Sequence, residues 1–267
     1  MKLSDACDAF LEDCRARNLS ASAFGNYKGV LGQLLDFANT RGISEISEID
    51  VAALRSWRAS WGIKPATHQL RLAQLKRLFG FAVNEGWIAE SPAEPLKAPK
   101  NDAAPTMPLA REEIRAMFAA AGGATRERAL LMLMRYSGLA IRDASTLRCD
   151  ALDGAELTMR RAKSGELVMC TLPAQVADEL ESCGRDRPHF FWTGSFKSGT
   201  VANYWRQRLA QIADKAGVQD FRTHRLRDTF AVELLLADVS IEDVSVLLGH
   251  SSVQTTERYY APWDPSR

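Results

Sequence analysis

The sequence predicts a mainly α-helical chain of two domains, the second of which also contains a small antiparallel sheet of three strands. Apolar residues recur at helical spacing through the first 90 residues, and prolines cluster over residues 91–108. Between residues 156 and 172 the apolar pattern changes to a period of two, which is typical of strands. We therefore expect a helical domain over residues 1–90, a linker over residues 91–108 and a second domain over residues 109–267.

Helices account for the whole first domain in this prediction. The second of them follows Ser20 or Ser22, either of which can cap a helix N-terminus, and it stops at Gly42. A short third helix comes next. Thr67 is the expected cap of a longer fourth helix, which ends near Gly86.

Proline density separates the two domains. The prolines of this stretch are Pro92, Pro95, Pro99, Pro105 and Pro108. Proline fixes its own φ and lacks an amide hydrogen, so this density opposes both helix and sheet. The stretch is therefore predicted to be a linker.

The second domain is expected to place helices around the small sheet. Two strands, over residues 156–160 and 167–172, are joined by a hairpin turn at Lys163-Ser164-Gly165. A third short strand is expected over residues 189–192. The predicted helices cover residues 112–121, 126–136, 141–147, 201–216, 227–237 and 241–248.

Composition excludes several classes of protein. The formal net charge is only +1, so the overall charge does not indicate a nucleic-acid binder. There is no apolar run near 18 residues and no apolar leader, so we expect neither a membrane span nor a secretory signal. Five cysteines without C-x-x-C spacing are predicted to be free thiols in a reducing cytoplasm: Cys7, Cys14, Cys149, Cys170 and Cys183.

One stretch of the first domain is strongly basic. Residues 51–84 contain no Asp or Glu. Contacts of Lys and Arg with phosphate release counterions and bind DNA without reading its sequence. On charge alone the stretch is either a DNA-binding surface or a solvated helix face. The predicted DNA-binding residues are Arg55, Arg58, Lys64, Arg71, Lys76 and Arg77.

The C-terminal part of the chain carries the motifs that suggest chemistry. His224 and Arg227 are three residues apart at the start of a predicted helix, so they share a face. Leu248-Gly249-His250 follows, and then the pair Tyr259-Tyr260. Attack on a phosphodiester needs an oxygen nucleophile and cations on the non-bridging oxygens, and arginine can supply the cation without a metal.

This order of motifs resembles the C-terminal signature of the tyrosine recombinases, the phage-integrase family. The resemblance implies a SAM-like helical core-binding domain followed by an α-rich catalytic domain, acting together on double-stranded DNA. It implies site-specific recombination, in which a tyrosine attacks a DNA phosphodiester and forms a 3′-phosphotyrosyl intermediate. It also implies four protomers on the DNA, a phage or mobile-element setting, and no metal or other cofactor.

The resemblance assigns roles to individual residues. Arg227 would clamp the scissile phosphate, and His224 and His250 would bind the phosphate or assist proton movement. Lys163, at the hairpin tip, matches the lysine that gives a proton to the leaving 5′ oxygen.

Two tyrosines compete for the role of nucleophile. Tyr259 lies nine residues after His250, which is the spacing in many family members. A subset of the family instead has its tyrosine followed by Ala-Pro-Trp, and here that residue is Tyr260. We favour Tyr260 and leave Tyr259 as the alternative.

One motif of the family is incomplete. Where a G-L-R motif would place an arginine at a helix start, this chain has Gly138-Leu139-Ala140. Arg142 is the nearest replacement, although two helical residues lie about 200° apart. Asp143 is expected to buttress an arginine. Three explanations stay open: Arg142 compensates, the chain is a weakened or inactive DNA-binding relative, or the alanine was introduced to hold a complex. A helical scaffold for protein partners would not explain the ordered C-terminal motifs.

Overall fold

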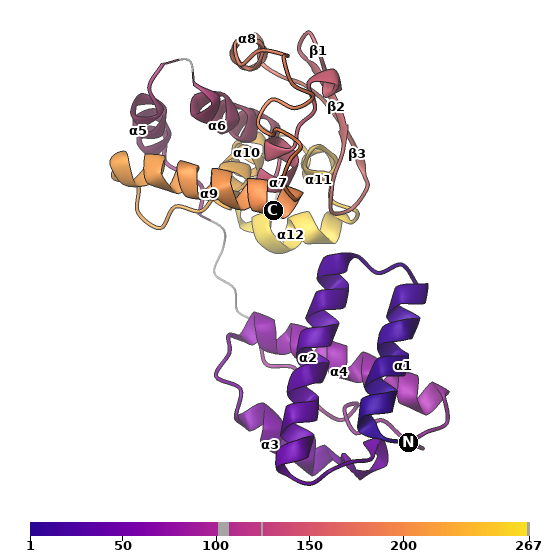
Figure 1. The fold of residues 1–267 in the computed structure, drawn as a ribbon. Coiled ribbons are helices and arrows are strands. Elements are labelled where there is room, and N and C mark those ends of the chain that lie inside the picture. The colour runs from indigo at the N-terminus through magenta and orange to yellow at the C-terminus, as the bar shows by residue number, and fades with distance from the viewer. Residues whose placement is uncertain (101–106, 124, 266–267) are drawn as a thin grey trace. The chain divides into compact units, whose positions relative to one another are not determined.

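The chain folds into two compact units. The computed structural model describes residues 1–100, 107–123 and 125–265. The first unit covers Met1–Ala103 and the second covers Ala104–Arg267 (Figure 1). The central part of the predicted linker, residues 101–106, lies outside the described residues. As predicted, both units are mainly helical, and a sheet occurs only in the described part of the second.

Four α-helices build the first unit, as the apolar periodicity predicted. Ser20 caps the second of them by accepting from the amide of Ala23 at 3.2 Å. The expected cap at Thr67 is wrong, because the fourth helix already begins at Pro65, whose fixed φ suits the first position of a helix. The helices are α1 (Leu3–Ala16), α2 (Ala21–Thr40), α3 (Val51–Ala59) and α4 (Pro65–Asn84), with a 3-10 turn η1 (Ile46–Glu48).

Part of the predicted linker packs on the first unit. Ala93 and Leu96 are 0% and 3% exposed and belong to the same core as the four helices. Nη2 of Arg58 donates to the carbonyl of Lys97 at 2.8 Å, and Nζ of Lys76 donates to the carbonyl of Glu94 at 2.9 Å. Apolar side chains between the prolines therefore extend this unit beyond residue 90. Two of the predicted DNA-binding side chains are used to hold this extension in place.

The second unit contains eight α-helices among its described residues. Two of them, α8 and α12, each of eight residues, were not predicted. The helices are α5 (Arg111–Ala121), α6 (Arg126–Ser137), α7 (Ile141–Ser145), α8 (Ala174–Glu181), α9 (Ser198–Lys215), α10 (His224–Leu236), α11 (Ile241–Leu248) and α12 (Val253–Tyr260). Two 3-10 turns complete the unit, η2 (Cys149–Ala151) and η3 (Ala261–Trp263).

The sheet has the three antiparallel strands that were expected, but one of them is a different segment. Its order is β1 (Leu152–Asp153), β2 (Glu156–Arg160) and β3 (Leu167–Thr171). The segment His189–Trp192 is not a strand, and His189 makes only an isolated bridge to Arg148. Its two phenylalanines are at most 5% exposed and fill the helical core instead of pairing with a strand.

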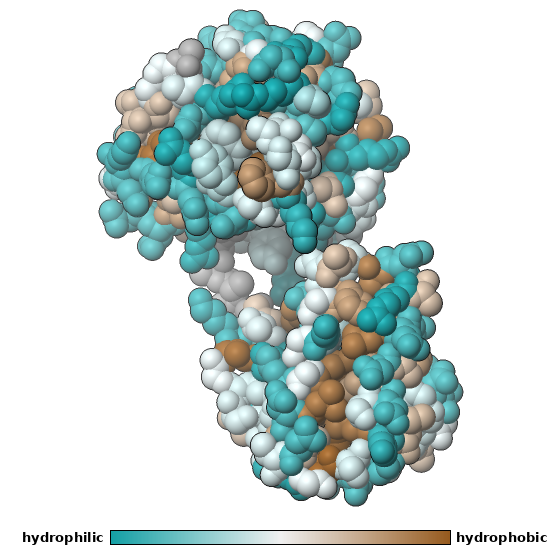
Figure 2. All heavy atoms as spheres, viewed as in Figure 1, coloured by the Kyte–Doolittle hydropathy of each residue, from teal (hydrophilic) through white to brown (hydrophobic). Residues whose placement is uncertain are grey.

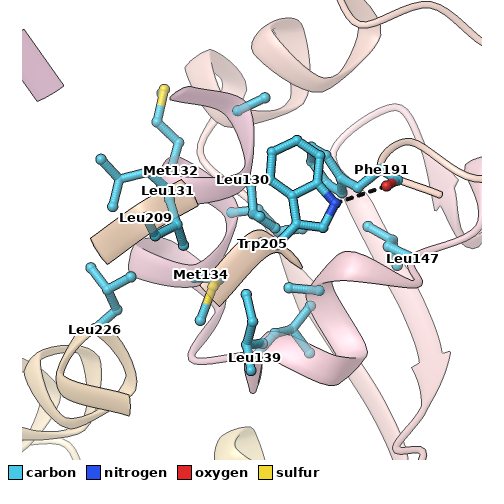
Figure 3. Packing of buried hydrophobic residues seen from close by; sticks show 14 of the residues in the cluster. Leu130, Leu131, Met132, Met134, Leu139, Leu147, Phe191, Trp205, Leu209 and Leu226 are labelled. Carbon is cyan, nitrogen blue, oxygen red and sulfur yellow. Dashed lines mark hydrogen bonds between the residues drawn. The ribbon is translucent and has the colours of Figure 1, made fainter. Parts of the chain in front are cut away.

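The main core of the second unit surrounds Trp205 of α9. Its indole Nε1 donates to the carbonyl of Phe191 at 2.9 Å, and leucines and methionines from α6 and neighbouring segments pack nearby (Figure 3). Leu139 belongs to this core, so the core fixes the backbone that leads into Ala140. A smaller cluster joins α10, α11 and Tyr260 of α12.

The surface differs between the two units. In the view of Figure 2, hydrophilic residues dominate the second unit, whereas a band of hydrophobic residues runs along the helices of the first. Within the described residues, no helix combines the length and the apolar character that crossing a bilayer requires.

Gly138 ends α6 in the left-handed conformation, with φ of 62°. A Cβ at this position would lie 2.5 Å from Cδ1 of Phe230. We expect Gly138→Ala to lower the free energy of unfolding by about 2–5 kcal/mol, because left-handed strain and overpacking add. Urea unfolding measures this loss. Gly217→Ala is the matched control, because Gly217 has φ of 72° and nothing within 4 Å. An equal loss in both variants would show that the contact with Phe230 does not matter.

Candidate active site

Arg227 is the centre of a buried cluster in the second unit. It lies in the first turn of α10 and is 6% exposed. Its Nη1 donates to the carbonyl of Gly138 at 2.6 Å, and its Nη2 donates to the carbonyl of Leu248 at 2.8 Å. The same Nη2 lies 2.9 Å from Nε2 of His250. Burial, followed by the charge of Arg161, lowers the pKa of Arg227 to about 10, so it stays cationic at neutral pH.

His250 is held as one neutral tautomer. Because arginine only donates, Nε2 of His250 accepts from Arg227 and the ring proton is on Nδ1. Nδ1 lies 2.8 Å from Oγ1 of Thr256, to which it donates. Burial, followed by the charges of Arg227 and Arg161, lowers the pKa of His250 to about 4. In this arrangement His250 orients Arg227 and has no free donor on Nε2.

This lowered pKa predicts an acid-sensitive fold. Between about pH 6.5 and pH 4, the unfolded chain binds a proton on His250 and the folded chain does not. The free energy of unfolding should therefore fall as pH falls through this window, by at most about 1.4 kcal/mol per pH unit. Urea unfolding across the window measures the slope.

His250→Asn is the comparison that isolates this group. The lowered pKa values of His68 and His189 act in the same direction, but they contribute equally to the parent and the variant. The slope should be smaller in His250→Asn. Identical slopes would assign the acid sensitivity to other residues.

Tyr260 joins the cluster, whereas Tyr259 does not. The hydroxyl of Tyr260 donates to Oδ1 of Asp228 at 2.7 Å, and the side chain is 2% exposed. Burial and the Asp228 carboxylate raise the pKa of Tyr260 above its usual range, and burial also raises the pKa of Asp228. The ring of Tyr259 is 42% exposed and lies 5.9 Å from the guanidinium carbon of Arg258.

His224 and Lys163 lie at the edge of the cluster. Nε2 of His224 is 3.4 Å from Oδ1 of Asp228, and 64% of the histidine side chain is exposed. Lys163 is exposed in the turn between β2 and β3. Its charge contributes to the lowered pKa of His250, so its ammonium lies within electrostatic reach of the cluster.

An open cavity of about 570 Å³ adjoins these residues. Arg227 and His224 line it, and so does Ala140 at the start of α7. Arg206 and Arg222 add two further basic side chains to its wall. An anion that enters the cavity meets basic groups from two helices and a loop, and this surrounding suits a phosphate.

Comparison with known proteins assigns the chain to a family. Residues 108–264 match the description "Phage integrase family", and residues 7–86 match "Phage integrase, N-terminal SAM-like domain". The chain belongs to the phage integrase family. The family and the SAM-like helical domain, both expected from the sequence, are confirmed.

The matches to known proteins cover almost the whole of this member of the integrase family. A "Tyrosine recombinase XerC" of Roseiflexus sp. (strain RS-1) is 26% identical, and the match covers 96% of this chain and 89% of the relative. The structure of a lambda integrase dimer bound to a COC′ core site has a TM-score of 0.77 at 19% identity, covering 97% and 77% of the two chains. A lambda integrase tetramer bound to a Holliday junction has a TM-score of 0.75 at 19% identity, covering 94% and 78%. These structural likenesses show a shared fold.

The structure does not place Arg142, the expected replacement for the missing arginine, beside Arg227. Its Nη2 lies 3.0 Å from Oγ of Ser198 at the start of α9, and its side chain is exposed. The angular offset between positions 140 and 142 explains this direction, because the side chain leaves the helix on another face.

A buried arginine that the sequence analysis did not single out lies near Arg227 instead. Arg161 is 4% exposed, and its Nη1 is 3.3 Å from Oδ2 of Asp143. The signal for it was the pair Arg160-Arg161 at the end of a predicted strand, because the period of two turns one member of such a pair inward. Asp143 therefore does buttress an arginine, but one that directly follows β2 and does not come from its own helix.

Some of the predicted DNA-binding side chains of the SAM-like domain are bound to other groups of the chain and are not available to contact phosphate. Arg55 and Lys64 are exposed. The exposed Arg77 donates from Nη1 to the hydroxyl of Tyr27 at 2.7 Å, and the guanidinium carbon of Arg71 lies 4.8 Å from the ring centre of Trp61. With Arg58 and Lys76 bound to the extension of the unit, four of the six remain as candidates for phosphate contacts.

The candidate site offers cationic donors from Arg227 and its neighbours. Among the described residues, no group of three or more His, Cys, Asp and Glu side chains is arranged to hold a metal ion. The five cysteines are free thiols.

Proposed function

We propose that this chain cuts and rejoins double-stranded DNA at a specific site through a covalent tyrosine intermediate. One observation carries the proposal: a tyrosine hydroxyl, a buried arginine and two histidines meet beside a basic cavity, in a chain of the phage integrase family. These are the groups that phosphoryl transfer to a tyrosine requires. The catalytic residues in this proposal are Tyr260, Arg227, His224 and Lys163, and His250 is the positioning residue that orients Arg227.

The contacts suggest how the atoms move. Oη of Tyr260 attacks the phosphorus, and its proton passes to Asp228, whose raised pKa makes it the better acceptor. The bond from phosphorus to the 5′ oxygen breaks, and that oxygen takes a proton from Lys163. Arg227 neutralises charge on the non-bridging oxygens, where it accumulates, and His224 hydrogen-bonds them. The product is a 3′-phosphotyrosyl bond and a free 5′-hydroxyl, and a second 5′-hydroxyl reverses the step.

The hydroxyl of Tyr260 is not accessible for attack in this structure. It is buried on Asp228, and the ring of Tyr260 packs in the cluster formed by α10 and α11. Attack therefore requires α12 to move when DNA enters. The exposed Tyr259 is the alternative nucleophile, but its ring lies on the surface, away from the contacts of Arg227.

The proposed partner is double-stranded DNA, bound by four protomers. Structures of the similar lambda integrase contain a core site and a Holliday junction, the second with a tetramer. The exposed basic residues of the SAM-like domain would add phosphate contacts. We also propose a cytoplasmic setting on a phage or mobile element, in agreement with the free cysteines and the family.

A second function is favoured by Ala140. A chain that keeps the DNA-binding surfaces but lacks one guanidinium at the phosphate would bind its site and cut it slowly or not at all. Loss of one such donor costs about 10²- to 10³-fold in rate.

Trapping of covalent protein–DNA adducts tests the proposal. The full chain is recovered under denaturing conditions from the cells that encode it, and the attached DNA is sequenced. A recurrent sequence joined to the protein through its 3′ phosphate is expected. Absence of adducts, together with recovery of one recurrent sequence by reversible crosslinking, would instead establish the binding-only function.

A further inference from the structure

Asp143 is a buried carboxylate close to the proposed phosphate site. It is 5% exposed and lies one helical turn after Ala140, in α7. Residues three apart on a helix are neighbours, so an arginine at position 140 would be its natural partner. With alanine there, an unpaired carboxylate would carry a large burial cost and would repel an incoming phosphate.

Arg161, the residue after the end of β2, supplies the missing partner. Its Nη1 lies 3.3 Å from Oδ2 of Asp143, while the backbone amide of Ala162 donates to Oδ1 at 2.8 Å. The two residues that follow β2 therefore satisfy both oxygens of the carboxylate. Nη2 of Arg161 is 3.3 Å from the carbonyl of Leu247, and its Nε is buried without a partner.

Arg161 and Arg227 are held side by side at the end of α11. Arg161 donates to the carbonyl of Leu247, and Arg227 donates to the next carbonyl, that of Leu248. The following residue, Gly249, has φ of 64°, and a Cβ there would lie 2.9 Å from Nε of Arg161. Glycine at this position thus leaves the space that the second guanidinium occupies.

We infer that Arg161 replaces the arginine missing at Ala140, by pairing Asp143 and supplying the second buried positive charge of the phosphate site. Ala140 and Arg227 line the cavity, whereas Arg161 does not. Arg161 is therefore a positioning residue. It acts by pairing with Asp143 and by adding a positive charge near Arg227. This inference rests on the proposed function.

An arginine exchange between positions 161 and 140 tests the inference. Adduct formation by the full chain is timed on a nicked duplex that carries the DNA sequence recovered by trapping. Arg161→Gln should slow it by about 10²-fold or more, since one cationic group of the site is lost. Adding Ala140→Arg to Arg161→Gln should restore most of the rate. Arg160→Gln, on the neighbouring exposed arginine, is the matched control and should stay near the parent rate.

A second measurement needs no DNA. The charge of Arg161 contributes to the lowered pKa of His250. NMR titration of His250 should therefore show a higher pKa in Arg161→Gln and no change in Arg160→Gln. If Arg161→Gln does not fold, Arg161→Lys, which keeps the charge, should retain most of the parent rate.

Several results would overturn the inference. One is a gain of about 10²-fold from Ala140→Arg alone, because it would show that the site still lacks a guanidinium while Arg161 is present. Another is a loss in Arg142→Ala as large as that in Arg161→Gln, which would favour Arg142. Absence of adducts from the parent and every variant would instead remove the proposed function, and this inference with it.

Discussion

Tyr260→Phe is expected to abolish covalent adduct formation completely. The substitution removes the only oxygen of this side chain and leaves the ring that packs between α10 and α11. The fold should therefore survive, with the loss confined to the hydrogen bond to Asp228. Denaturing gels of the protein with its nicked duplex measure the adduct, and circular dichroism checks the fold.

Tyr259→Phe is the matched control for this prediction. Tyr259 is the adjacent residue of the same type, but it is exposed and outside the cluster. We expect it to form adducts at close to the parent rate. If Tyr259→Phe loses the adduct and Tyr260→Phe keeps it, the nucleophile is Tyr259, and the contact between Tyr260 and Asp228 is structural.

Arg227→Lys is expected to slow adduct formation by about 10³-fold or more. Lysine keeps the charge, but it lacks the fork of donors that reaches Gly138, Leu248 and His250 together. One donor of this kind is worth about 10²- to 10³-fold, and here several are lost together with the orientation of His250. Single-turnover rates on the nicked duplex measure the effect.

Arg225→Lys separates this catalytic loss from a structural one. Arg225 lies in the same turn of α10 and also donates to backbone carbonyls, those of Pro108 and Gln219. Its Nη2 also lies 3.3 Å from Oε2 of Glu113 in α5. We expect similar losses of stability from both substitutions and a large loss of rate only from Arg227→Lys. Equal rates in the two variants would show that Arg227 serves the fold and not the chemistry.

The sequence predicted the helical class and the gathering of Arg227, His250 and a tyrosine, because these depend on periodicity and on motif order. It left the choice between Tyr259 and Tyr260 open. Adjacent helical residues point about 100° apart, and only the packing of α12 shows which one meets Asp228.

The inward position of Arg161 could not be predicted from the sequence either. Whether this residue or Arg160 turns inward depends on where β2 ends, and its partner Asp143 is 18 residues away in the sequence. The third strand was misplaced for a related reason. An apolar run such as Phe190-Phe191 fits either a strand or the space between helices, and its neighbours in three dimensions decide.

The double role of Tyr260, as proposed nucleophile and as core residue, connects the stability of the fold with DNA affinity. Detaching α12 exposes the apolar cluster that Tyr260 shares with α10 and α11, so the cutting-competent state is the less stable one without DNA. If Tyr260 is the nucleophile, DNA supplies the difference, and the apparent affinity is lower than the intrinsic affinity by the fraction of molecules already open. The same cost keeps the tyrosine away from phosphates that are not held in the cavity, so weak packing of this helix would weaken the safeguard against indiscriminate cutting.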